Sequence, residues 1–173
     1  RTLIDTQGYG RDDSALPKLI LKVYDSARCH RNPDAWLSKC LADATAEGIT
    51  DAGDTLWGRQ ILQELHQQVD EHIAALRWCI DRLTGMDKME KVLSNLGDTL
   101  SQLQALAGLN SWDEVHAFGQ LTYSTLTFPR KMEDTFLPEQ VKALRKRCKD
   151  EMSKALTVFS DDSKTVMEDL AGC

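Results

Sequence analysis

Residues 57–107 read WGRQILQELHQQVDEHIAALRWCIDRLTGMDKMEKVLSNLGDTLSQLQALA, and their apolar pattern decides the fold. Apolar side chains recur every three or four residues in two runs, and this spacing places each run on one face of an α-helix. Gly85 lies between the runs as a turn signal. Residues 55–107 are therefore predicted to form an antiparallel helical hairpin. The runs are Trp57, Ile61, Leu65, Val69, Ile73, Leu76, Ile80 and Leu83, then Met89, Leu93, Leu96, Leu100, Leu103 and Ala107.

The flanking sequence predicts further helices and one loop. Capping residues at 12–14 precede an apolar stripe that includes Ile20 and Tyr24, and a second helix is predicted to bury Trp36, Cys40 and Leu41. Residues 124–137 have no helical period and contain Pro129, so an extended loop is expected there. The prediction is an all-α, elongated bundle of about six to seven helices. The flanking helices are expected at about 14–28, 33–47, 111–118 (or as far as Tyr123), 138–159 and 162–170.

Composition limits the classes of protein. The 173 residues carry a formal net charge of −6, so any nucleic-acid contact needs a local basic patch. Five cysteines without a CxxC pair indicate reduced, mostly packing thiols in a cytoplasmic protein. No stretch is apolar enough to predict a membrane span or a signal peptide. The chain begins at Arg1 rather than Met, and we expect it to be one helical subdomain, residues 1–173, of a longer polypeptide.

No motif for catalysis or cofactor binding is recognised. The glycines form neither of the common phosphate loops, and no serine or cysteine lies in a nucleophile-elbow motif. Asp113 and His116 have the i, i+3 spacing of di-iron bundles, but that site needs a second such motif and further carboxylates. His72 is expected at the edge of the core, with His66 on the polar side of the same helix. The fragment is therefore predicted to hold no catalytic, cofactor or metal site.

A basic cluster is the one charge pattern that suggests a ligand. Helical spacing places four cations on one face, and two more precede them in the loop. Such a basic stripe fits a phosphate backbone, whereas the alternative is a solvated helix face balanced by nearby carboxylates. A second polar group, around Tyr24, Arg28, His30 and Arg31, reads either as a structural network or as a contact surface. The candidate DNA-binding residues are Arg130, Lys131, Lys142, Arg145, Lys146 and Lys149.

Several stretches together resemble one family, AddA (also called RexA), the helicase/nuclease subunit of bacterial double-strand-break repair. The resemblance is carried by GYGRDDSAL at residues 8–16 and by LILKVYDSARCHRNPDAWL directly after it at 19–37. Shorter matches are WGR at 57–59, SWDE at 111–114 and VKALRKRCKDE at 141–151. The matched region is similar to the helical insertion of the first motor lobe, called subdomain 1B, in UvrD-like helicases.

The resemblance implies a parent chain that unwinds and degrades broken DNA, using ATP and Mg²⁺ that this fragment does not bind. It implies duplex DNA and an AddB-type partner subunit. Because contacts to phosphates carry no sequence information, the DNA is expected to be bound without sequence preference, and the sequence predicts no membrane contact. The expected role is a non-catalytic helical arm that contacts duplex DNA beside the motor. The alternative is a scaffold subdomain that holds the partner subunit without touching DNA. Salt-sensitive DNA binding would favour the arm, and an exposed apolar patch without DNA affinity would favour the scaffold.

Overall fold

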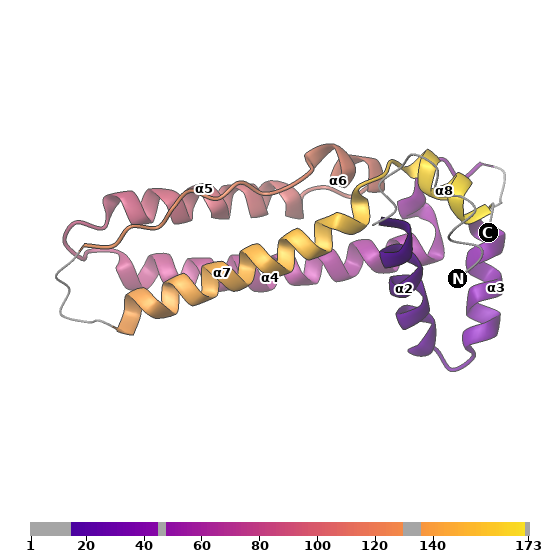
Figure 1. Ribbon diagram of the computed structural model, residues 1–173, viewed down its shortest axis with the longest axis horizontal. Helices are drawn as coiled ribbons and strands as arrows, with labels where there is room; N and C mark the ends of the chain where they lie inside the picture. Colours follow the sequence, from indigo (N-terminus) through magenta and orange to yellow (C-terminus); the bar gives the residue numbers. More distant parts are fainter. Residues whose placement is uncertain (1–14, 45–47, 130–135, 172–173) are drawn as a thin grey trace. The chain divides into compact units, whose positions relative to one another are not determined.

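The computed structural model describes residues 15–44, 48–129 and 136–171 (Figure 1). Over these ranges the chain forms seven α-helices, two short 3₁₀ helices and no strand, which confirms the all-α prediction. The lead-in at 1–14 and the loop residues 130–135 lie outside the described residues. The helices are α2 (Ala15–Arg28), α3 (Pro33–Ala44), η1 (Ala52–Asp54), α4 (Leu56–Leu83), α5 (Glu90–Ala107), α6 (Trp112–Phe118), α7 (Phe136–Leu156), η2 (Thr157–Phe159) and α8 (Ser163–Ala171).

The start of α7 differs slightly from the prediction. α7 begins at Phe136, two residues before Pro138, which the sequence placed at the helix start. Proline is tolerated in a first helical turn because the N–H that it lacks has no partner there. The predicted break after Phe159 is present, since η2 ends at that residue and α8 begins at Ser163. The helical spacing therefore located the elements. The predicted end of the second helix, residue 47, lies outside the described residues, which show α3 as far as Ala44.

The chain divides into two compact units. Unit 1 comprises Arg1–Glu64, Asn110–Gly119 and Leu156–Cys173, and unit 2 comprises Leu65–Leu109 and Gln120–Ala155. Helix α4 contributes its first turns to unit 1 and the remainder to unit 2. Each unit has its own core and is described separately.

Unit 2 is built on the predicted hairpin, which is confirmed. α4 from Leu65 onward runs antiparallel to α5, and α7 lies beside α4 (Figure 1). His72 of α4 and Glu151 of α7 are 3.1 Å apart, which fixes the contact between these two helices. The core side chains with almost no exposed surface are Val69, Leu76, Cys79 and Leu83 of α4, Met89, Val92, Leu96, Leu103 and Leu106 of α5, and Val141, Cys148 and Met152 of α7.

Residues 120–129, here called the extended segment, form no helix and run beside α5 (Figure 1). The side chain of Gln102 holds the backbone of Thr122 at both polar groups. The Thr122 N–H donates to Gln102 Oε1 at 2.8 Å, and Gln102 Nε2 donates to the Thr122 carbonyl at 3.1 Å. Asn95 Nδ2 donates to the Thr125 carbonyl at 2.9 Å. Amide side chains of α5 therefore form hydrogen bonds with backbone polar groups of this segment, as a neighbouring strand would in a sheet.

The buried face of α5 differs from the predicted one by a rotation about the helix axis, toward the side where the extended segment lies. Thr99 is buried, whereas the predicted Leu93 and Leu100 are only half-buried. At 100° per residue, Thr99 lies on the side of the helix toward Asn95 and Gln102, which hold the segment. The buried Thr99 hydroxyl has a hydrogen-bond partner, since it donates to the Asn95 carbonyl at 3.0 Å. The predicted stripe was therefore wrong by part of a turn, because a loop without periodicity covers that side.

In unit 1, hydrogen bonds connect the N-termini of η1, α6 and α8. Asp51 accepts hydrogen bonds from the backbone N–H groups of Gly53 (2.7 Å), Trp112 (2.9 Å) and Asp113 (3.3 Å), at the starts of η1 and α6. The Asp113 carboxylate accepts from the Ser163 N–H at the start of α8, at 2.7 Å. The Ser163 hydroxyl then accepts from the Ala52 N–H at 2.9 Å, which returns to η1. Carboxylates are favourable at helix N-termini, where backbone N–H groups lack intrahelical partners.

An aromatic cluster forms the core beside these caps. Trp57 meets Trp112 edge to face, with ring centroids 5.6 Å apart, and Trp112 meets Phe159 at 4.4 Å. The Trp112 indole N–H donates to the Asp161 carbonyl at 2.9 Å. α4 approaches η1 so closely that a Cβ on Gly58 would lie 1.8 Å from the Ala52 carbonyl oxygen. Glycine is therefore required at this position for steric reasons.

Helices α2 and α3 expose more apolar surface than their patterns suggested. Ile20, Leu21 and Tyr24 of α2 are exposed, with Leu21 at 60% and Tyr24 at 53%. Leu41, which the sequence placed among the buried residues of the second helix, is also exposed. Trp36 and Cys40 are buried as predicted. The outer side of α2 is thus an apolar surface of unit 1.

Candidate nucleic-acid interface

The predicted basic stripe lies on α7, in unit 2, but its four helical members do not share one environment. Lys142, Lys146 and Lys149 are exposed, whereas Arg145 keeps only 8% of its surface. Arg130 and Lys131 lie outside the described residues. The sequence placed all four α7 cations on one solvent face, and the structure instead places Arg145 among the buried residues Val141, Cys148 and Met152.

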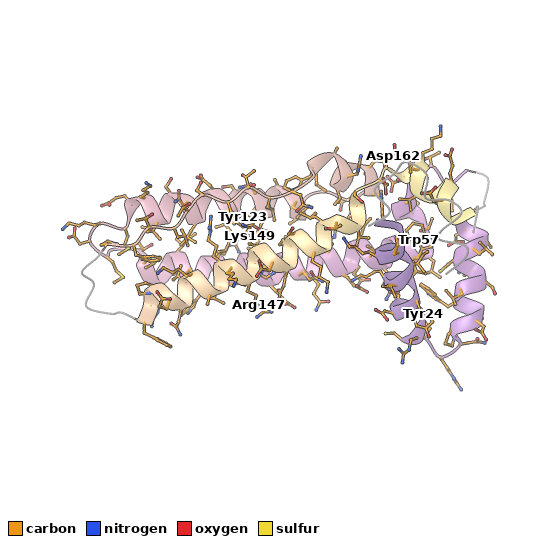
Figure 2. All side chains as sticks on the ribbon, viewed as in Figure 1. Tyr24, Trp57, Tyr123, Arg147, Lys149 and Asp162 are labelled. Atoms are coloured by element: carbon orange, nitrogen blue, oxygen red, sulfur yellow. The ribbon has the colours of Figure 1, made fainter. Side chains whose placement is uncertain are left out.

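Aromatic rings of the extended segment lie under these cations. The Arg145 guanidinium carbon is 5.2 Å from the centre of the Tyr123 ring, and Lys149 Nζ is 5.9 Å from the same ring. Lys142 Nζ is 5.8 Å from the centre of the Phe128 ring. Figure 2 shows Tyr123 and Lys149 next to each other between the extended segment and α7. Cation–π attraction of this kind holds each cation over the negative face of a ring.

Arg145 is the electrostatically unusual member. Its Nε and Nη2 atoms are buried and have no hydrogen-bond partner among the described residues. Burial lowers the pKa of the Arg145 guanidinium, although arginine stays protonated under ordinary conditions. Burial also raises the pKa of the Tyr123 hydroxyl, which lies 3.9 Å from Cys148 Sγ, so Tyr123 stays neutral and supplies no counter-charge. A permanent positive charge is therefore held beside two neutral side chains.

The opposite side of α7 is neutralised by its own ion pairs. Arg147 donates to Glu151 at 2.8 Å, and that hydrogen bond is the main cause of the lowered pKa of Glu151. Glu151 also faces His72, whose pKa is lowered by burial despite the nearby carboxylate. On the stripe itself, Lys142 pairs with Glu139 at 2.8 Å. Lys146 and Lys149 have no carboxylate partner within the described ranges, so they are the accessible, uncompensated cations of the stripe.

Comparison with known proteins relates this chain to one type of protein, the A-type subunits of ATP-dependent helicase/nuclease. The A-type subunit of Clostridium kluyveri is 23% identical over 165 residues, or 94% of this chain. Those of Acetivibrio thermocellus and Bacillus cytotoxicus are each 26% identical, over 97% and 88% of the chain. Nearly the whole of this chain is similar to one segment of these helicase/nuclease subunits.

The chain spans only about 13% of the length of the Clostridium kluyveri relative. No protein-family model matches it, and no solved structure matches it. The similarity to the helicase/nuclease subunits therefore rests on sequence alignment over nearly the whole of this chain. It agrees with the resemblance already found in the run at residues 19–37.

Two residues of the candidate interface were not identified from the sequence. Phe128 occurs in the stretch without helical periodicity, and Tyr123 stood only as an alternative end of the helix that begins near Ser111, so no apolar pattern marked either as part of an interface. The available signal was the position of two aromatic residues in a threonine-rich run just before the basic helix. Aromatic side chains beside cations are typical of surfaces that bind single-stranded nucleic acid, whereas here the two rings pack against the cations of α7.

The other candidate groups have structural roles. His116 Nδ1 lies 2.9 Å from the Phe159 carbonyl, and His66 Nε2 lies 2.7 Å from the Leu109 carbonyl. His72 is buried, at the edge of the core as predicted. His30 stacks on Trp36 with ring centroids 4.8 Å apart, which supports the structural reading of the group near Tyr24 and Arg28. Among the described residues there is no group of three or more metal-ligating side chains and no helix able to cross a membrane.

The described cysteines are free thiols. Cys40, Cys79 and Cys148 are buried, and Cys29 is exposed. Burial raises the pKa of Cys40 and Cys79 to about 11 each, so they remain protonated at neutral pH. Protonated thiols are poor nucleophiles and poor metal ligands. These two cysteines therefore act as packing residues, as the sequence suggested.

Proposed function

We propose that this chain is a non-catalytic helical arm of an ATP-dependent helicase/nuclease, and that α7 contacts duplex DNA without sequence preference. The observation that carries the proposal is the exposure of Lys146 and Lys149, beside Lys142, without carboxylate partners within the described ranges. With a net charge of −6, the chain has few other places where several phosphates could be met at once. Lysine contacts to phosphates carry no sequence information.

The parent protein supplies the chemistry in this proposal. The relatives are named as ATP-dependent helicase/nuclease subunits, so ATP and Mg²⁺ would be used elsewhere in the parent chain. Residues 1–173 would act as one 1B-like subdomain of the first motor lobe. The parent would work in the cytoplasm with an AddB-type partner in double-strand-break repair. The isolated chain is expected neither to hydrolyse ATP nor to cut DNA.

A second function, the scaffold, is favoured by a different observation. The exposed side chains Ile20, Leu21 and Tyr24 form an apolar surface on α2, and such surfaces often contact protein. In this reading the chain holds the partner subunit or the rest of its own parent chain, and α7 is a solvated helix. The two functions use different units, so each can be tested without disturbing the other.

The test of the DNA-contacting role reverses the charge of two exposed lysines. Lys146→Glu with Lys149→Glu should weaken binding of the chain to a labelled 20-base-pair duplex, measured by fluorescence anisotropy at two salt concentrations. Loss of two phosphate contacts should reduce the log–log salt slope by about 1.8. An unchanged affinity and slope would remove α7 from the DNA path.

The matched control is Lys91→Glu with Lys154→Glu. Both lysines are exposed on helices of unit 2, outside the basic stripe, and the pair changes the net charge by the same amount. If this control weakened binding as much as the α7 pair, the effect would be one of overall charge. The proposal requires the α7 pair to weaken binding distinctly more.

A further inference from the structure

Arg145 is a cation without a counter-charge in the part of the chain that the structure describes. It is more than nine-tenths buried, and its Nε and Nη2 atoms have no hydrogen-bond partner there. Buried charges in folded proteins are normally paired, because transfer of an unpaired ion out of water is unfavourable. The Tyr123 ring compensates only in part, since its face offers a quadrupole, and the Tyr123 hydroxyl lies near Cys148 Sγ rather than accepting from Arg145 Nε or Nη2. The site therefore lacks an anion that would satisfy the guanidinium fork.

No nearby carboxylate of the described chain fills this role. Glu151 is engaged by Arg147 and His72 on another side of α7, and Glu139 is engaged by Lys142. Asp150 is close enough to help raise the pKa of Tyr123, but no hydrogen bond or ion pair joins it to Arg145 among the described residues. Lys149 shares the Tyr123 ring with Arg145 and has no carboxylate partner within the described ranges. The electrostatic potential around Arg145 thus favours an anion from outside the chain.

The cover over Arg145 is the extended segment, which is held at its backbone by few bonds. Side chains of Gln102 and Asn95 provide the hydrogen bonds to Thr122 and Thr125 that the structure records. Tyr123 lies between these two anchoring points and remains partly exposed. A rotation of its ring would open the guanidinium to a ligand without breaking either anchor.

We propose that Arg145 is a receptor for a tetrahedral oxyanion, taken up between α7 and the extended segment when the Tyr123 ring moves aside. The fork of Nε and Nη2 matches two oxygens of a phosphate or sulfate group. The inference rests on the proposed function for the source of this group, which is then a phosphodiester of bound DNA. Free inorganic phosphate is the other source with the same chemistry.

The first arm of the test uses sulfate and phosphate as probes, with thermal unfolding of the 173-residue chain as the readout. The unfolding temperature is measured in sodium chloride and in sodium sulfate or phosphate of equal ionic strength. These anions stabilise most proteins by exclusion from the surface, so the informative quantity is the difference between variants. Arg145→Met should lose part of the stabilisation by the oxyanions, whereas the control Lys154→Met, at an exposed α7 position, should keep all of it.

The same variant separates a binding role from a structural one. Replacing a buried, unpaired charge by an apolar side chain of similar length should leave the unfolding temperature in chloride unchanged or raised. If Arg145→Met lowered the unfolding temperature in chloride and kept the full oxyanion increment, Arg145 would be structural and the inference overturned. Arg145→Lys keeps the charge and loses the fork, so it should keep only part of the increment.

The second arm uses the 20-base-pair duplex and identifies the source of the oxyanion. If Arg145 takes a phosphodiester, Arg145→Met should reduce the log–log salt slope of DNA binding by about 0.9. An unchanged slope together with a lost oxyanion increment would overturn the phosphodiester assignment and leave a site for free phosphate. The proposed function fails separately, when charge reversal at Lys146 and Lys149 leaves DNA binding unchanged.

Discussion

Asp51 and Trp112 are joined by a hydrogen bond of 2.9 Å from the Trp112 N–H to Asp51 Oδ1, which fixes the start of α6 to η1. The same carboxylate holds the N–H groups of Gly53 and Asp113. One side chain therefore caps two helices that are separated by about 60 residues of sequence. Loss of this carboxylate would leave the part-buried N–H groups of Gly53 and Trp112 without their acceptor.

Asp51→Ala is expected to destabilise unit 1 by about 2 to 4 kcal/mol, because charged caps of this kind contribute roughly 1 to 2 kcal/mol per helix. Chemical denaturation with a tryptophan-fluorescence readout measures it, since Trp57 and Trp112 lie in the affected core. Asp51→Asn keeps one acceptor oxygen and should lose less. Asp54→Ala, at an exposed position of η1, is the control and should change little. Equal losses for Asp51→Ala and Asp54→Ala would contradict the capping role.

Leu76→Asp should destabilise unit 2 by about 3 to 5 kcal/mol, because it buries a carboxylate without a partner in the hairpin core. Leu76 exposes only 1% of its surface. Ala74→Asp introduces the same group two residues away, on the exposed side of α4, and should cost little. Thermal unfolding followed by circular dichroism compares the two. The hairpin packing would be wrong if both variants unfolded at the temperature of the parent.

Two glycines of the helices should respond to alanine in opposite directions. Gly58→Ala should destabilise the chain by about 3 kcal/mol, since the new Cβ would overlap the Ala52 carbonyl at 1.8 Å. Gly97→Ala should stabilise it by about 0.5 to 1 kcal/mol, because no atom lies within 4 Å of the new Cβ and alanine favours a helix. Urea midpoints of both variants test this. Destabilisation by Gly97→Ala would show that α5 is packed differently.

The stability of unit 2 should fall on acidification below about pH 6.5 because of His72. Burial lowers the pKa of His72 in the folded state from its usual 6.5, so the unfolded state binds more protons between the lowered pKa and 6.5. Stability therefore rises with pH across that window. Glu151 and Glu71 oppose the shift and Arg147 supports it. Urea midpoints at several pH values should show a shallower acid loss for His72→Gln, and an identical pH profile would contradict the assignment.

The sequence predicted the hairpin because Leu76 and Leu103 follow the 3.6-residue repeat, and repeat spacing is a local property of the chain. It could not predict the burial of Thr99 or Arg145, since the residues that cover them lie in the extended segment. That segment has no period of its own, and its position depends on Gln102 and Asn95, two polar residues that a hydrophobic pattern ignores. The exposure of Ile20 and Tyr24 was missed for the converse reason. An apolar stripe indicates a helix face that is suited to packing against another surface, but it does not identify that surface or show that it belongs to the same chain.

Gln102 is hydrogen-bonded to Thr122, and Asn95 to Thr125. The distance from Asn95 to Gln102 along α5 must therefore match the distance from Thr122 to Thr125 along the extended segment. Seven helical residues rise about 10.5 Å, and three extended residues span about 10 Å, so the two anchoring points coincide. An insertion or deletion in α5 between Asn95 and Gln102 would break this coincidence unless the extended segment changed in proportion. Because each helical residue also turns the chain by about 100°, only whole turns keep both anchors on one side of α5. Over evolutionary time, gains and losses in these two stretches should therefore occur together, at about seven helical residues for three extended ones.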